Sequence, residues 1–171
     1  MKRFMLLAIL SFVLLMPFGM DVQAQPKEVA EAVTVTVYVT PKILPLDEGR
    51  VCANWDAIAI ILSETGSGLF HQATYHTLGG FTVEKGKFSE QGSGFYNLQN
   101  GDKVFLTFTA TGEMKPGGAG SETKAIQTFT GGTGKCAGIQ GGGTFNRLTL
   151  RPAVEGTAQL YMKGTIKYTL P

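Results

Sequence analysis

Strict alternation of apolar and polar residues constrains the fold of this chain more than any other feature. In the segment "AVTVTVYVT", residues 32–40, the valines share one face while threonines and a tyrosine share the other. This period of two is typical of a half-buried β-strand. The C-terminal residues 158–170 repeat the pattern, with Leu160, Met162 and Ile166 on one side. The sequence therefore predicts that the folded part begins and ends in amphipathic strands.

Further strand candidates lie between these two, separated by short turn sequences rich in glycine, asparagine and proline. The clearest turn contains Asn100 and Gly101, which tolerate the positive φ angles of a two-residue hairpin. By contrast, residues 41–56 hold two prolines and a charge cluster, and we expect a long surface loop there. The candidates are residues 57–62, 69–76, 80–85, 92–98, 103–111, 123–130 and 143–150.

Turns this brief leave no room for crossover helices, so the strands are predicted to form an antiparallel meander. An open sheet of this size would expose its edges, whereas closure into a barrel removes them. We therefore predict an all-β fold, a single closed antiparallel β-barrel of eight or nine strands over residues 32–171. Such a barrel is either filled by side chains or holds one small ligand.

The glycine-rich stretch "FTGGTGKCAGIQGGGTF", residues 129–145, has the spacing of a dinucleotide-binding loop at Gly132, Gly134 and Ala137. That chemistry requires a helix after the glycines, so that the pyrophosphate meets the helix N-terminus. Here three consecutive glycines and a strand pattern follow instead. A phosphate-binding loop also fails, because Cys136 stands where Ser or Thr is needed. We predict no nucleotide, and a structural role for the glycines at a barrel corner.

The same stretch resembles the glycine-rich strand-turn-strand of the allene oxide cyclase and dirigent barrel superfamily, especially its secreted bacterial relatives of unassigned function. The match includes Thr133, Lys135 and Ile139, whereas Cys136 replaces the usual aromatic residue. The resemblance implies an eight-stranded calycin-type barrel, often a dimer or trimer, whose enzymes steer an apolar or phenolic substrate. Only the scaffold aligns, so no catalytic residue is carried over. The glycines expected to shape it are Gly131, Gly132, Gly134, Gly138, Gly141 and Gly143.

The N-terminus reads as a secretory signal peptide, with a basic start, an apolar run and a small-residue cleavage site after Ala24. Residues 1–24 are thus predicted to be removed, and residues 25–31 to form a flexible mature N-terminus. The predicted location is secreted or periplasmic. The apolar run is too short for a membrane span, and no later segment approaches that length.

Cleavage removes Lys2, Arg3 and Asp21, so the formal net charge falls by one from +2. The remaining basic residues are scattered rather than clustered, which disfavours a nucleic-acid partner. Cys52 and Cys136 would enter an oxidising compartment. Two alternatives remain for these cysteines: a disulfide between them, or two unpaired buried thiols. Their spacing in the sequence does not show whether their Cα atoms lie within bonding range.

Few residues suggest chemistry. His71 and His76 are five apart on one predicted strand and face opposite sides, so we expect hydrogen-bonded or surface histidines and no metal site. Tyr168 should point inward with Ile166, and Asn146 should do so if it shares the face of Leu148 and Leu150. Tyr168, Asn146 and His76 are therefore the weak pocket candidates. Carboxylates near turns, namely Glu90, Glu113 and Glu122, are interpreted as solvated surface groups.

These observations predict an extracytoplasmic barrel without a cofactor. We favour a non-catalytic module that binds a small apolar ligand or contributes a stable surface to an assembly. The alternative is a cyclase, isomerase or dirigent-type enzyme. A filled barrel argues against both small-molecule hypotheses, and an apolar cavity favours binding. An inward carboxylate or tyrosine with a shifted pKa beside a cavity favours an enzyme.

Overall fold

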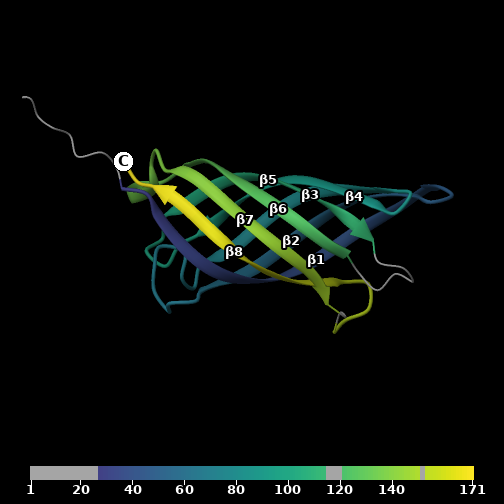
Figure 1. Ribbon diagram of the computed structural model, residues 1–171, viewed down its shortest axis with the longest axis horizontal. Coiled ribbons are helices and arrows are strands. Elements are labelled where there is room, and N and C mark those ends of the chain that lie inside the picture. The colour runs from purple at the N-terminus through teal and green to yellow at the C-terminus, as the bar shows by residue number, and fades with distance from the viewer. Residues whose placement is uncertain (1–26, 115–120, 151–152) are drawn as a thin grey trace, which may run out of the picture.

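Eight long strands run in sequence order around a closed antiparallel barrel, each hydrogen-bonded to the next and β1 to β8 (Figure 1). This computed structural model describes residues 27–114, 121–150 and 153–171. The predicted all-β barrel is confirmed, with eight strands. A one-turn 3-10 helix, η2 (Gly134–Cys136), joins β6 to β7. The strands are β1 (Val29–Asp47), β2 (Arg50–Ser63), β3 (Thr74–Glu84), β4 (Lys87–Asn97), β5 (Lys103–Met114), β6 (Ser121–Gly132), β7 (Gln140–Leu150) and β8 (Ala158–Thr169).

The barrel has two different ends. At the closed end lie the chain's C-terminus and the β2–β3, β4–β5 and β6–β7 connections, and at the hairpin end lie the β1–β2 and β3–β4 turns (Figure 1). Phe70, from the β2–β3 connection, is fully buried at the closed end. Its ring packs 5.1 Å from that of Tyr96 and 5.5 Å from those of Phe129 and Tyr168. An aromatic cluster thus seals this end of the barrel.

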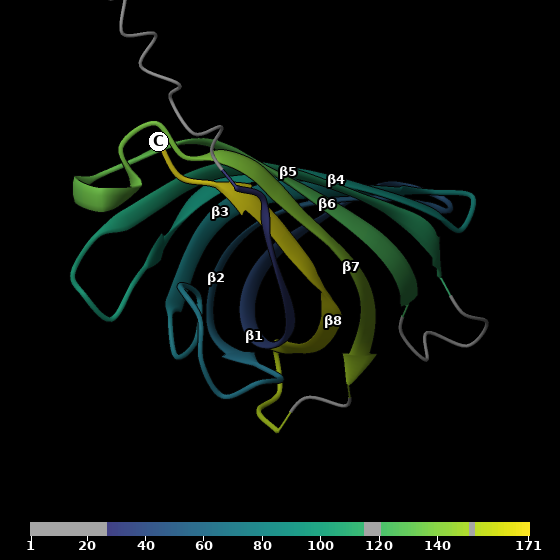
Figure 2. The same cartoon turned by 60° about the vertical axis from the view of Figure 1, so that its left-hand side comes forward.

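Inward glycines make room for large aromatic rings in the barrel core. A Cβ on Gly79 would lie 2.6 Å from the Trp55 ring, and one on Gly92 would lie 2.7 Å from the Phe108 ring. Trp55 and Phe108 in turn pack with their centroids 5.6 Å apart. The strands curve tightly around this interior in the turned view (Figure 2). Pairing large residues with small ones across facing strands lets a narrow barrel reach a dense core.

The expectation of a loop over residues 41–56 is wrong, because β1 runs to Asp47 and β2 begins at Arg50. Only a tight turn separates them, with Gly49 at a φ of 77°. Likewise, Val29–Glu31 already belongs to β1, and Glu31 is buried, so the predicted flexible segment 25–31 is wrong at these positions. Residues 25 and 26 and the predicted signal peptide lie outside the described residues.

The prolines of β1 lie on an edge that β8 leaves unpaired. Pairing of β1 with β8 ends at Val39 and Ala158, whereas pairing with β2 continues to the turn. The Ala32 carbonyl accepts from the Glu64 N–H at 2.9 Å, which directs even-numbered β1 residues toward β2 and odd-numbered ones away. Pro41 and Pro45 therefore sit where the missing N–H would face no strand, and proline is tolerated at such edges.

One strand replaces two predicted ones in β3. The glycines after Leu78, expected in a turn, lie inside the strand, and Gly79 pairs with Gly92 of β4. Conversely, residues 69–73, expected in a strand, form the connection that carries Phe70. Among the described residues, no helix has the length and apolar character to cross a membrane.

Candidate functional site

The glycine-rich stretch forms the corner between β6 and β7 rather than a ligand cradle. Gly134 has a φ of 52°, and its backbone lies against the Asp102 carboxylate, which accepts the Lys135 N–H at 3.1 Å. Gly141 has a φ of 128°, and a Cβ there would collide with the Lys167 carbonyl. Gly131 and Gly138 also have positive φ, and side chains at Gly132 and Gly143 would collide with Cys136 and Phe145.

Cys52 and Cys136 are both unbridged and lie at opposite ends of the barrel. Cys52 is half-buried on β2, where it pairs with Leu44 near the hairpin end. Cys136 is fully buried in η2 at the closed end, where burial raises the pKa of its thiol and the nearby Asp102 raises it further. Of the two alternatives, the structure therefore has separate thiols, since nearly the whole length of β2 separates the two ends.

Tyr168 points into the barrel and holds the closed end together. Its hydroxyl donates to the Glu31 carboxylate at 2.7 Å, and the same carboxylate accepts the N–H groups of Leu69 at 2.8 Å and Phe70 at 3.3 Å. Burial, followed by the hydrogen bond to Glu31, raises the pKa of Tyr168. Tyr168 thus helps one buried carboxylate to fasten the loop that carries Phe70.

The two other candidates face outward. Asn146 is exposed on β7, as are Leu148 and Leu150, while Phe145 and Arg147 are buried. The expectation that Asn146 points inward is therefore wrong. The His76 side chain is 41% exposed on the outer face of β3, and its Nε2 lies 3.0 Å from Asp56 Oδ1.

His71 lies in the β2–β3 connection, where its Nδ1 accepts the Ser63 N–H at 3.2 Å. It does not share a strand with His76, because β3 begins only at Thr74.

A chain of polar side chains links β4, β6 and β3 inside the barrel, next to the aromatic cluster of the closed end. The Tyr96 hydroxyl donates to Gln127 Oε1, and Gln127 Nε2 donates to the Tyr75 hydroxyl at 3.3 Å. All three residues are buried. Burial raises the pKa of Tyr75, and it raises that of Tyr96 well above its ordinary value. Both tyrosines therefore keep their protons and act as hydrogen-bonding core residues.

A buried ion pair lies beside this chain. Arg147 Nη1 donates to Glu90 Oε2 at 2.5 Å, and both side chains are 6% exposed. Arg147 Nε also donates to the Thr123 hydroxyl at 2.7 Å, and the guanidinium lies 5.2 Å from the Phe88 ring centroid. Desolvation raises the pKa of Glu90, and the Arg147 charge opposes that rise only in part. The interpretation of Glu90 as a solvated surface group is wrong, whereas Glu113 and Glu122 are exposed.

The space inside the barrel is small. A cavity of about 30 Å³ lies between the ion pair and the polar chain, with Val37, Ala57 and Met162 among its apolar walls. Trp55 also lines this cavity, where its buried indole N–H interacts with the Glu90 carboxyl group and slightly lowers that group's pKa. Pockets for drug-sized ligands occupy about 300–1,000 Å³. The barrel interior is therefore essentially filled by its own side chains.

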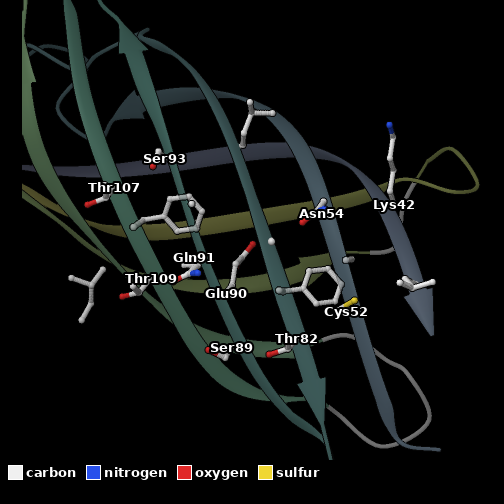
Figure 3. A pocket seen from close by; sticks show the side chains of 18 of the residues that line it. Lys42, Cys52, Asn54, Thr82, Ser89, Glu90, Gln91, Ser93, Thr107 and Thr109 are labelled. Atoms are coloured by element: carbon white, nitrogen blue, oxygen red, sulfur yellow. The ribbon is translucent and has the colours of Figure 1, made fainter. Parts of the chain in front are cut away.

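A much larger hollow of about 890 Å³ lies on the outer face over β1 to β6 (Figure 3). We call it the outer groove. Strand register arranges its side chains in three rows that cross the strands. The first row contains Leu78, Ser93, Thr107 and Thr128; the second Lys42, Asn54, Gly80, Gln91, Thr109 and Ile126; and the third Leu44, Cys52, Thr82 and Ser89.

The outer groove is lined by uncharged hydrogen-bonding side chains and apolar residues in similar proportion. Most of its labelled side chains carry hydroxyls or amides, such as Ser93, Thr109 and Gln91, and the others are Lys42, Cys52 and Glu90 (Figure 3). Gly80 has no side chain at the centre of the second row, and a Cβ there would press against Asn54 Oδ1 at 2.9 Å. Lys42 is the one charged lining residue apart from Glu90, whose charge is paired with Arg147 in the core.

Sequence reasoning missed both the ion pair and the outer groove. The buried charges interrupt the apolar pattern of their strand faces, and the groove depends on register between strands, which the hydrophobic pattern of one strand does not contain. No protein-family model matches the chain, and a comparison with curated proteins finds no match either. The resemblance to the allene oxide cyclase and dirigent superfamily is thus supported only by the shared antiparallel eight-stranded barrel.

Proposed function

We propose that this protein is an extracytoplasmic binding module whose barrel is a rigid scaffold and whose ligand occupies the outer groove. The observation that carries the proposal is the contrast between a cavity of about 30 Å³ inside and a hollow of about 890 Å³ outside. The signal-peptide pattern supports the location. The groove chemistry fits an uncharged ligand rich in hydrogen-bonding groups, because exposed charges are almost absent from its lining.

Neutral polar probes test this location of the ligand. We would titrate the ¹⁵N-labelled protein with isopropanol and N-methylacetamide and follow its amide resonances. Shifts should gather at groove residues such as Gln91 and Thr109, and Gln91→Ala should reduce them. The matched control is Thr34→Ala on the outer face of β1 outside the groove, which should leave them unchanged. Shifts spread evenly over the barrel would contradict the proposal.

A second function, a cyclase or isomerase acting inside the barrel, is favoured by one observation. Glu90, a carboxyl group with a raised pKa, lies with Arg147 beside the small cavity, which the Trp55 indole also lines. Such perturbed groups gather at catalytic sites. A substrate of the apolar or phenolic class would require the cavity to enlarge about tenfold to reach the usual pocket size.

The single tryptophan separates these two functions. Trp55 is the only tryptophan of the chain and lines the interior cavity, so its emission reports any ligand that enters the barrel. The outer-groove proposal expects no change in this emission when phenol or a fatty acid is added. Saturable quenching or a spectral shift would instead place the ligand inside and favour the enzyme. The dimer or trimer that the resemblance implies remains a separate prediction, to be checked by sedimentation.

A further inference from the structure

Five outward side chains form one continuous row across five strands, beside the outer groove. Tyr38 pairs with Ile58, Ile58 with His76, His76 with Phe95, and Phe95 with Phe105. The row therefore runs from β1 to β5 at right angles to the strands. We call it the aromatic row, after the rings of four of its five members.

The aromatic row is held open to solvent although its members are large. Ile58 is 60% exposed, Tyr38 49% and Phe105 39%. The His76 and Phe95 rings meet edge to face at 5.7 Å, and Lys103 Nζ lies 4.8 Å from the Phe95 centroid. Single exposed apolar residues are normal, but a contiguous strip of them marks an interaction surface.

Strand register places the β3, β4 and β5 members of the aromatic row directly along one side of the outer groove. The next outward row contains Leu78, Ser93 and Thr107, which line the groove. Each lies two positions along its strand from His76, Phe95 or Phe105, respectively. Diagonal and same-face neighbours at this spacing lie about 7 Å apart, within reach of one bound molecule. A ligand in the groove would thus meet ring faces on one side and hydroxyl or amide groups on the other.

We propose that the ligand is a neutral polysaccharide whose chain runs across the strands, with sugar rings stacked on the aromatic row. This inference rests on the proposed binding role of the outer groove. Sugar rings present an apolar C–H face and a rim of hydroxyls, and the aromatic row and the groove present the matching surfaces. Neighbouring strands lie about 4.8 Å apart, which is close to the length of one sugar unit in a chain.

Charge argues for a neutral chain. In the described residues, the groove lining carries Lys42 and the core residue Glu90. The aromatic row adds His76, which Asp56 accompanies at 3.0 Å, and Lys103 lies against Phe95. A polyanion such as a nucleic acid would require a cluster of basic side chains, which these surfaces lack in the described residues. The aromatic row has a single basic neighbour, Lys103, whereas a stacking platform for bases lies along a positively charged groove.

Affinity electrophoresis in gels containing soluble neutral polysaccharides tests the proposal directly. The probes are hydroxyethylcellulose, dextran and galactomannan, with the anionic polymer heparin for comparison. We expect retardation by at least one neutral polymer and none by heparin. Tyr38→Ala and Phe105→Ala should each weaken that binding about three- to tenfold, as expected for the loss of one stacked ring. Tyr161→Ala removes a tyrosine that is 37% exposed on β8, outside the row, and should have no effect.

The possible failures are distinguishable. If no neutral polymer retards the protein while isopropanol still shifts groove amides, the polysaccharide inference is overturned and the groove function stands. If a polymer binds but Tyr38→Ala and Phe105→Ala bind as tightly as wild type, the stacking role of the row is overturned. A dimer in sedimentation that Tyr38→Ala dissociates, without polysaccharide binding, would assign the row to a second copy of the chain. Thermal denaturation of each variant confirms that it is folded.

Discussion

The buried Glu90–Arg147 pair provides the sharpest test of the barrel interior. Arg147→Met keeps most of the side-chain volume but removes the only cation that contacts the Glu90 carboxylate in the described residues. Two unit charges about 4 Å apart attract by about 4 kcal/mol at an effective dielectric constant of about 20. Breaking a buried pair by removing one partner costs about 3–5 kcal/mol. The variant should lose that amount in a urea unfolding experiment at pH 7.

The size of this loss should depend on pH, because Glu90 titrates. Burial already raises the Glu90 pKa above its ordinary value of 4.5 in the folded protein, and loss of Arg147 would raise it further. A raised carboxyl pKa stabilises the fold below the unfolded-state pKa, and this contribution is lost as pH rises through the folded-state pKa. The cost of Arg147→Met should therefore be smallest near pH 4 and grow toward neutral pH.

The double variant Glu90→Met, Arg147→Met completes the comparison. Because apolar residues of similar volume replace buried ion pairs at little cost, this variant should regain most of the stability lost by Arg147→Met alone. The reasoning is refuted if Arg147→Met costs less than about 1 kcal/mol at pH 7, or if its cost is the same at pH 4 and pH 7. Either result would mean that the carboxylate is solvated rather than buried.

Three further predictions follow from local contacts. Tyr168→Phe removes a hydrogen bond to the Glu31 carboxylate and should lower the unfolding free energy by about 1.5–3 kcal/mol in urea denaturation; no change would mean that the bond is not formed. Cys52 should react with a maleimide in the native protein, whereas Cys136 should react only after unfolding. The measurement is mass spectrometry after alkylation without reductant, and a disulfide would be indicated if neither cysteine reacts. Pro45→Val adds an N–H to the open edge of β1 and should promote self-association beyond that of the wild type, measured by sedimentation; an unchanged oligomeric state would contradict the assigned edge.

The fold was predictable because its strands repeat a simple alternation, but the ends of the strands were not. Valines on one face of β1 and threonines on the other identify that strand without structural data. Pro41 and Pro45 appeared to end it, since proline usually interrupts a sheet. Their positions are compatible with a strand only because β8 stops short of them, and that depends on the whole barrel rather than on local sequence.

The buried charges, and which face of β7 points into the barrel, could not be predicted from the sequence for a related reason. In β7 the leucines at 148 and 150 are exposed, while Arg147 is buried, so the usual assignment of apolar residues to the core selects the wrong face. Arg147 is acceptable inside only because Glu90 faces it from β4, a residue distant in sequence. The inward orientation of Tyr168 could be predicted because its neighbours on β8 alternate between buried apolar and exposed polar residues in the ordinary way.

The glycines show why function is more readily placed outside this barrel than inside it. Inward Gly79 and Gly92 are each covered by an aromatic ring, so the space they leave is already occupied and their replacement would disturb the core. Outward Gly80 differs, because it lines the outer groove and an added Cβ would meet the end of the Asn54 side chain rather than an aromatic ring. Surface substitutions usually change stability by less than about 0.5 kcal/mol, whereas core substitutions cost several times more. A fold of this kind can therefore alter the side chains of its outer rows with little loss of stability, and binding specificity can change there while the barrel stays intact.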